Sequence, residues 1–265
     1  MEAAQLAEEL KGSALDYAAL LDPQHERWSD LGGGSRAAIA TLLRLGLEQN
    51  RPLLLAAMAR FDNENLLQLL EALVSWSVRG LIVGGIGGGS TERAYANVAT
   101  LIRSGAVRTT AGVKRSLGEI LPGDKEFQSA LENTTISRVQ VAAYILLAVE
   151  RELASVEHAA LVDDEEMSRY RLEHVLPLRA TSDDWNEFSD DEVKPLAKRL
   201  GNLVLVPRTR TVPRGADWGE RRDMLRGLSI ETTRWIGDLR EWSPKSIRNR
   251  QHRLAVTALT VWPSF

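Results

Sequence analysis

Apolar residues recur at helical spacing through the first half of this chain, and this periodicity limits its fold more than any other feature of the sequence. Between residues 35 and 49, for example, leucines and an isoleucine return every three or four positions, which places them on one face of a helix. Similar segments continue to residues 137–154, the most apolar of them, with short Gly, Pro or Asn loops between. We therefore predict a mainly α fold with a helical N-terminal domain over residues 1–155.

An acidic linker, VDDEE at residues 162–166, separates this helical part from two short runs with the composition of strands. The first is RYRLEHVLP, which ends at Pro177, and the second is RLGNLVLVP, which begins at Arg199. A basic turn and three helical segments complete the chain. We therefore predict a smaller second domain over residues 156–265, with two strands, a helix and extra C-terminal helices.

The composition excludes several classes of protein. The 265 residues include no cysteine, which excludes disulfides, zinc–thiolate sites and cysteine nucleophiles. The first residues lack the basic and then apolar order of a signal peptide, and no stretch of 18 residues is apolar throughout. We therefore expect a cytoplasmic protein with no membrane partner.

Charge is distributed unevenly along the chain. Between Lys194 and Arg253 there are fifteen Lys or Arg against six Asp or Glu, a net charge of +9, so the other residues sum to −12 within the total of −3. A basic block on an acidic chain is typical of a segment with an anionic partner. A solvated charged surface explains the same count equally well.

A glycine-rich segment, GGIGGGST at residues 84–91, has two interpretations. The backbone amides of such loops can bind phosphate. The phosphate-binding loop of nucleotide hydrolases, however, needs a lysine before its Ser or Thr, and a dinucleotide-binding loop needs flanking strands. This segment has neither, so we interpret it as a flexible connector between helices.

The residues best suited to catalysis are Glu173 and His174, near the end of the first predicted strand, and Asn202 in the second run. A neutral histidine can take a proton from water near pH 7, and a divalent ion held by oxygen ligands can neutralise a phosphate. Neighbouring strand residues project to opposite faces. Glu173 and His174 can therefore serve one site only at a strand end or kink, and Pro177 is typical of such an end.

These segments together resemble a known family. EHVLP, RLGNLVLV, WGERRDMLRGLS and the closing helices are similar to the C-terminal HNH (ββα-metal, or His-Me finger) nuclease domain of GmrSD-type modification-dependent restriction endonucleases, over roughly residues 140–265. The helices upstream also resemble the middle region of that family. The resemblance implies a preceding ParB-like nucleotide-binding domain, which we expect as a partner absent from this chain. We also consider a narrower likeness to phosphorothioation-sensing defence nucleases.

Carried over residue by residue, the resemblance assigns roles to three positions. It makes His174 the general base, Glu173 the acidic partner that helps to hold the metal, and Asn202 the residue that orders the loop and the histidine. It also implies a divalent metal cofactor, Mg²⁺ or alternatively Mn²⁺, with His174 among its ligands.

The third element of the family pattern is not matched. Thr211 and Ala216 stand where the family has asparagines, and a threonine hydroxyl is a weaker metal ligand than an amide oxygen. Asp217 is our candidate for the missing metal ligand, and Asn249 and His252 are further candidates.

We expect DNA to bind mainly through its phosphate backbone and without sequence specificity, because arginines gather around the predicted site and no segment resembles a base-reading helix. The DNA-binding candidates are Arg208, Arg210, Arg214, Arg221, Arg222, Arg248, Arg250 and Arg253. Five tryptophans could stack on bases, but their spacing within helices favours core packing. They are Trp185, Trp218, Trp235, Trp242 and Trp262.

We therefore predict a metal-dependent DNA endonuclease that acts in defence against foreign DNA. A second hypothesis is a DNA-binding or regulatory module with the same fold but without catalysis, which Thr211 and Ala216 motivate. A third is a helical scaffold with no role in nucleic-acid binding.

Overall fold

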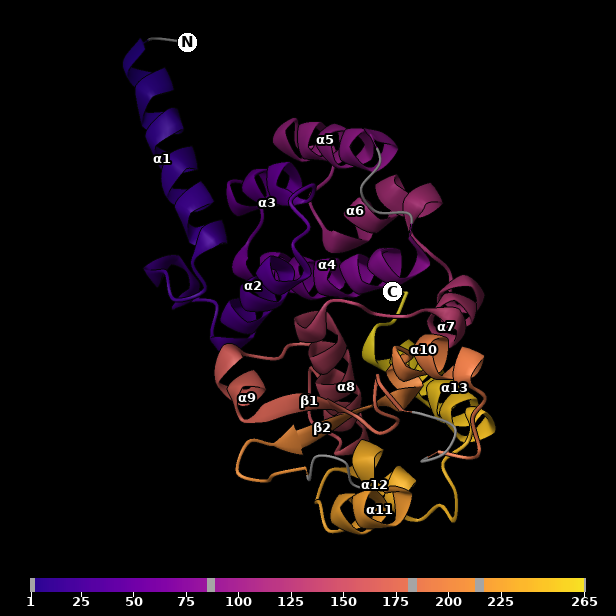
Figure 1. Cartoon of the computed structure of the whole chain (residues 1–265). Coiled ribbons are helices and arrows are strands. Elements are labelled where there is room, and N and C mark those ends of the chain that lie inside the picture. Colours follow the sequence, from indigo (N-terminus) through magenta and orange to yellow (C-terminus); the bar gives the residue numbers. More distant parts are fainter. Residues whose placement is uncertain (1–2, 85–88, 181–184, 213–216, 265) are drawn as a thin grey trace. The chain divides into compact units, whose positions relative to one another are not determined.

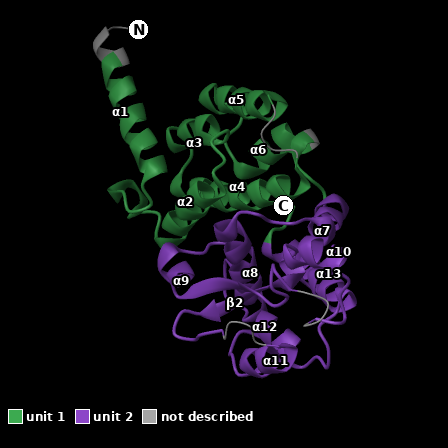
Figure 2. Ribbon diagram, in the orientation of Figure 1, with its two compact units in different colours: residues 1–123, 262–265 green, residues 124–261 purple. Residues whose placement is uncertain are grey.

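The computed structural model describes residues 3–84, 89–180, 185–212 and 217–264. It is mainly α-helical with one small sheet (Figure 1), which confirms the coarse part of the predicted fold class. The chain forms two compact units, residues 1–123 with 262–265 and residues 124–261 (Figure 2).

The first unit is built from helices joined by short turns. They are α1 (Ala3–Leu21), η1 (Glu26–Trp28), α2 (Gly33–Leu45), α3 (Arg51–Met58), α4 (Asn63–Val83), α5 (Gly89–Arg103), α6 (Thr110–Leu117) and η2 (Gly118–Ile120). Helix α4 begins where the Asp62 carboxylate accepts a hydrogen bond from the Asn65 amide, and it ends at Gly84, whose positive φ suits glycine. The predicted connector at residues 84–91 starts at this cap, and its residues 85–88 lie outside the described part of the chain.

Among the described helices, only α4 is long and apolar enough to cross a membrane, with a mean hydropathy of 1.5 over an 18-residue window. In the structure, 72% of that window is buried, and the core includes Leu73 and Trp76 from this helix. The Arg79 Nε also donates a hydrogen bond of 2.6 Å to the carbonyl oxygen of Trp262, in the C-terminal segment of the same unit. Helix α4 is thus the core helix of the first unit.

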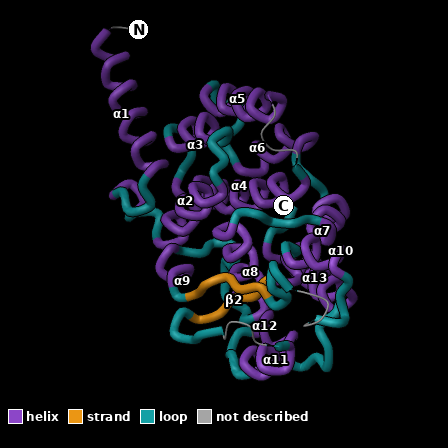
Figure 3. Tube along the Cα trace, in the orientation of Figure 1, coloured by secondary structure: helices purple, strands orange, loops and turns teal. Residues whose placement is uncertain are grey.

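The second unit contains the sheet (Figure 3). Its elements are α7 (Asp124–Asn133), α8 (Val139–Leu153), α9 (Asp164–Ser168), β1 (Tyr170–His174), α10 (Asp190–Ala197), η3 (Leu200–Asn202), β2 (Leu203–Pro207), α11 (Trp218–Arg226), α12 (Glu231–Gly237) and α13 (Pro244–Val261). The strands pair antiparallel in a register that places Tyr170 opposite Pro207 and His174 opposite Leu203. Both strands therefore lie within the predicted runs.

Helix α8 belongs to the second unit because it contacts β1, β2, α12 and α13. This unit consequently begins at Asp124, earlier than the boundary predicted between residues 155 and 156. The composition of the chain changes only where the sheet begins, whereas the helices that pack against the sheet start before it.

Most of the tryptophan side chains are used within the fold. Trp185, Trp242 and Trp262 are buried, as predicted, although all three lie outside the helices from whose spacing the burial was predicted. The Trp218 ring stacks on Trp242, with ring centroids 5.9 Å apart. The guanidinium of Arg253 stacks over the Trp235 ring, with its Cζ 3.5 Å from the ring centroid, in a cation–π contact. Packing within the protein therefore accounts for these aromatic residues without base stacking.

Candidate active site

The candidate active site is a small hollow where the two strands meet helix α11. It is lined by Glu173, His174, Val175, Val204, Val212, Arg221, Met224 and Leu225. His174 is the last residue of β1, directly after Glu173. Both residues line the same hollow.

The environment of His174 favours the neutral imidazole. The residue is half-buried, and burial lowers its pKa below the ordinary value of 6.5. The positive charge of Arg221 lowers this pKa further, whereas the Glu173 carboxylate raises it. Near pH 7 the ring is thus in the form that can accept a proton.

Arg221 connects helix α11 to the end of β1. Its side chain is 8% exposed, and its Nη1 donates a hydrogen bond of 3.1 Å to the carbonyl oxygen of His174. Burial lowers the pKa of this guanidinium and the Glu173 carboxylate opposes that shift. Arg221 is therefore a buried residue in the wall of the hollow. From the sequence, we had expected it to lie on the surface and to contact DNA.

Glu173 has a partner that the sequence analysis missed. The Arg171 Nε donates a hydrogen bond of 2.7 Å to its Oε1, in an ion pair between two partly exposed side chains. The two residues are two positions apart on β1, so they lie on the same face of the strand. The sequence could have predicted this ion pair, because an arginine and a glutamate two positions apart in a strand lie on the same face.

Asn202 is fully buried, and its side chain is saturated with hydrogen bonds. Its Oδ1 accepts from the Leu176 amide at 2.8 Å and from the Trp242 indole at 3.0 Å. Its Nδ2 donates to the carbonyl oxygens of Leu176 at 2.9 Å and Ala197 at 3.0 Å. The Val175 amide also donates to the Asn202 backbone oxygen at 2.9 Å. Asn202 thus fixes the segment that directly follows His174.

Helix α13 holds the turn that carries Asn202. The Arg250 Nη1 donates to the carbonyl oxygens of Gly201 and Leu203, both at 2.8 Å, and the Gln251 Oε1 accepts from the Gly201 amide at 3.0 Å. A Cβ on Gly201 would lie 2.3 Å from the carbonyl oxygen of Ile247 on α13, so no larger residue fits this contact.

The prediction that Arg250 binds DNA is wrong. Its side chain is 5% exposed, and its guanidinium is used to hold backbone carbonyls of η3 and β2. Burial lowers its pKa to about 9, which leaves it charged near pH 7, and Glu150 opposes this shift. The position is buried because this face of α13 packs against η3.

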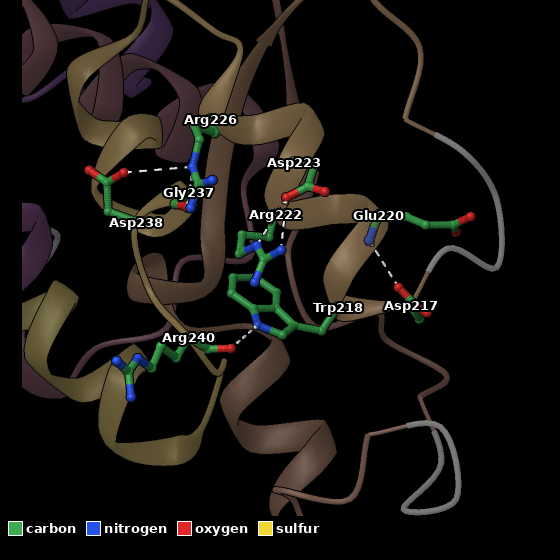
Figure 4. Close-up of polar contacts among 9 residues, drawn as sticks. All are labelled: Asp217, Trp218, Glu220, Arg222, Asp223, Arg226, Gly237, Asp238 and Arg240. Carbon is green, nitrogen blue, oxygen red and sulfur yellow. Dashed lines mark hydrogen bonds and ion pairs between the residues drawn. The ribbon is translucent and has the colours of Figure 1, made fainter.

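The predicted metal ligands are not gathered into one site. Among the described residues, no group of three His, Cys, Asp or Glu side chains is placed to hold a metal ion. Glu173 and His174 share the hollow, but Asp217 caps helix α11, where its Oδ1 accepts a hydrogen bond of 2.9 Å from the Glu220 amide (Figure 4). An aspartate directly before a helix is a common cap, which the sequence analysis had interpreted as a ligand.

Four of the predicted DNA-binding arginines lie exposed in the second unit: Arg208, Arg210, Arg248 and Arg253. Arg208 is anchored by its Nε, which donates to the carbonyl oxygen of Ser168 at 2.9 Å. The Arg222 side chain forms an ion pair of 3.0 Å with its neighbour Asp223 (Figure 4).

The other candidates are placed as follows. Arg253 is exposed and stacked on an indole ring, and Asn249 is exposed on α13. The His252 Nδ1 lies 2.8 Å from the Glu132 Oε1, within hydrogen-bond distance, and His252 does not line the hollow. Thr211 is exposed, and the predicted positions Arg214 and Ala216 lie outside the described residues.

Comparison with known proteins identifies one family. Residues 121–256 match the family described as GmrSD restriction endonucleases, C-terminal domain. The match begins just before α7 and includes both strands, α11, α12 and most of α13, so it covers nearly all of the second unit. No curated protein matches the chain, and the narrower likeness to phosphorothioation-sensing nucleases stays a prediction.

Proposed function

The chain belongs to the family of GmrSD restriction endonuclease C-terminal domains, and from this premise we propose that it hydrolyses DNA phosphodiester bonds bound at the mouth of the hollow beside His174. The placement of this residue carries the proposal. His174 ends β1, is half-buried, has a lowered pKa and shares the hollow with Glu173 and Arg221. Burial and charge together favour a neutral base beside a fixed cation, a combination typical of functional sites.

In the proposed reaction, a water oxygen attacks the phosphorus of a backbone phosphate, and the bond to the leaving sugar oxygen breaks. The imidazole of His174 takes the proton that the water loses. The guanidinium of Arg221 opposes the negative charge that grows on the phosphate. The leaving oxygen collects a proton from solvent.

We assign the HNH type to this site as part of the proposal. Strands β1 and β2 and helix α11 occur along the chain in the order of a ββα unit, with α10 and η3 inserted between the two strands. The hydrogen bond from Arg221 to His174 joins helix α11 to the end of β1. Asn202 supports the same segment from its other side. We propose that Asn202 is a positioning residue, because its polar side-chain atoms are engaged within the protein.

Dependence on a divalent metal ion, Mg²⁺ or Mn²⁺, is also part of the proposal, since nucleases of this kind typically need one. The described residues do not fit the three-ligand site that the sequence suggested. Mg²⁺ is often held by one or two carboxylates together with substrate phosphates, and Glu173 is the carboxylate that lines the hollow. When bound, the ion would neutralise charge on the phosphate. The reaction steps above use only residues of the chain.

DNA would bind through exposed arginines of the second unit, among them Arg208, Arg210 and Arg248. Contacts to phosphates give affinity without reading the sequence. We further propose that the protein restricts foreign DNA, with a separate nucleotide-binding domain as the partner that triggers it. This last part rests on the family resemblance.

The test is nicking of supercoiled plasmid by the full chain in the presence of Mg²⁺ or Mn²⁺. The His174→Ala variant is expected to lose at least about a hundredfold in rate, the lower end of what a general base contributes. His252→Ala is the matched control, because it also removes a histidine of the second unit but one that pairs with Glu132. Equal rates for wild type and His174→Ala would refute the proposed base.

A second candidate function is DNA binding without cleavage. It is favoured by the pairing of Glu173 with Arg171 and by the capping role of Asp217, which leave the predicted metal ligands otherwise engaged. Binding of the same plasmid without nicking, at all metal concentrations tried, would support this candidate and contradict the first.

A further inference from the structure

Helix α1 presents an apolar stripe to solvent. The stripe consists of Ala7, Leu10, Ala14, Tyr17 and Leu21, which recur every three or four residues and therefore share one face of the helix. All five are exposed, and the exposed fractions of Leu10, Tyr17 and Leu21 are 63%, 41% and 46%. A continuous row of large apolar side chains open to water is typical of a surface that binds a partner.

The first unit holds the C-terminal end of α1. Ala19 and Leu20 are buried there, where α1 contacts η1, α2 and α3 (Figure 1). Every residue from 7 to 15, in contrast, is exposed, and Gly12 lowers the helical propensity of this stretch. A helical stretch without tertiary contacts is marginally stable in water. A partner helix along the stripe would therefore stabilise α1.

Large and small residues alternate along the stripe in an order that makes it complementary to itself. When two copies of α1 run antiparallel with Gly12 at the level of the twofold axis, Leu10 faces Ala14 of the second copy. Tyr17 then faces Ala7 of the second copy. Each layer pairs a large side chain with a methyl group, which lets the two helices approach closely. The same residues serve both copies, as a twofold contact requires.

The charged side chains of α1 do not oppose this contact. The Lys11 Nζ lies 3.7 Å from the Glu8 Oε1, and the Asp16 Oδ1 lies 3.4 Å from the Arg27 Nε, so both charges that flank the stripe are paired within the chain. Glu9 lies about 100° round the helix from the centre of the stripe, where it stays in water. The stripe itself carries no charge, so two copies can meet without desolvating an ion.

The area of such a contact is that of a weak dimer. A helix of 19 residues is about 28 Å long and about 10 Å wide. Two of them in contact along their length remove on the order of 1,000 Å² from water, near the lower limit for a specific interface. We propose that α1 docks antiparallel on α1 of a second copy of this chain and so forms a homodimer, with a dissociation constant on the order of 10 µM. This dimer is independent of the proposed nuclease function, because α1 belongs to the first unit.

The test is sedimentation velocity of the full chain without DNA, over concentrations on either side of the expected dissociation constant. The wild type should pass from monomer to dimer. Leu10→Ala should raise the dissociation constant at least about tenfold, because each dimer loses two leucine side chains from its central layers. Leu10→Ala combined with Ala14→Leu exchanges the two residues, so every layer again pairs large with small and the wild-type dissociation constant should return. Leu15→Ala is the matched control, because Leu15 is 56% exposed but lies outside the stripe.

Three results would overturn the proposal. A wild type that stays monomeric at every concentration would show that α1 does not dock a second copy. Association that Leu10→Ala leaves unchanged would show that another surface forms the dimer. A double variant as weak as Leu10→Ala alone would contradict the antiparallel register. Thermal melts of all variants check their folding, which should be unaltered because the replaced residues are exposed.

Discussion

Replacement of Asn202 by alanine is expected to destabilise the second unit more than most single substitutions would. The side chain is fully buried, and it makes four hydrogen bonds, to the Leu176 amide and carbonyl, the Trp242 indole and the Ala197 carbonyl. Alanine removes all four at once and leaves their partners buried. The Leu176 amide and the Trp242 indole then lose their acceptor.

The magnitude follows from these two donors. A buried polar group without a partner costs about 1–3 kcal/mol, so the two N–H groups together cost roughly 2–6 kcal/mol. The carbonyl oxygens add less, since under-satisfied carbonyls are better tolerated. We expect the free energy of unfolding to fall by about 3–5 kcal/mol, a large part of the 5–15 kcal/mol typical of a domain.

Urea unfolding followed by tryptophan fluorescence measures this loss, because Trp242 is one of the bonded partners. With a slope of about 2 kcal/mol per molar urea, the midpoint of the transition that reports the second unit should fall by roughly 1.5–2.5 M. Asn249→Ala changes an exposed asparagine on α13 and should alter the free energy of unfolding by no more than about 0.5 kcal/mol. A loss below about 1 kcal/mol in Asn202→Ala would show that other contacts hold the segment after His174.

Further predictions concern the site and its surroundings. Burial lowers the pKa of His174, and the proposed base acts only in its neutral form. As the pH is lowered from 8, the nicking rate should therefore stay constant down to pH 6.5 and fall only below it. A rate that already falls by half between pH 8 and pH 6.5 would contradict this. Arg171→Ala frees the Glu173 carboxylate from its ion pair, so half-maximal activity should need about two- to fivefold less Mg²⁺, as expected for a weak, partly exposed pair; a higher requirement in a metal titration would argue against Glu173 as a ligand. Arg250→Ala should lower the free energy of unfolding by about 3 kcal/mol or more and leave the salt dependence of DNA binding unchanged, whereas Arg210→Ala should reduce the slope of log affinity against log salt by about one with little change in stability. Fluorescence titrations at several salt concentrations distinguish these two arginines, and equal slopes for wild type and Arg210→Ala would remove Arg210 from the interface.

Much of the secondary structure near the site could be predicted because it rests on local chemistry. The first strand lies where β-rich residues precede Pro177, and the second lies in the run from Leu203. The first strand ends at His174, as the position of Pro177 predicted. The burial of Trp185, Trp242 and Trp262 was also predicted, but these residues lie outside the helices, so their burial comes from tertiary packing and not from helical spacing.

The partners of individual polar residues were not predictable in the same way. Asp217 has the composition of a metal ligand, and its capping role follows from where α11 begins. Arg171 pairs with Glu173 within one strand, and this is the one partner among them that local spacing alone would indicate. The start of the second unit at Asp124 depends on which helices cover the sheet, and composition carries no record of that choice.

By itself, the sequence determined most of the helical segments, the two strands, the family resemblance and the position of the candidate base, since these depend on residue type and near-neighbour spacing. It missed two short helices: α9 (Asp164–Ser168) occupies most of the predicted acidic linker, and α10 (Asp190–Ala197) lies between the two strands. Only the tertiary structure decided which charges face solvent. Arg250 lies among exposed arginines in the sequence, yet its guanidinium is bonded to the Leu203 carbonyl, 47 residues away. Such contacts form when helices and strands pack, and packing brings together residues whose separation along the chain carries no periodic signal.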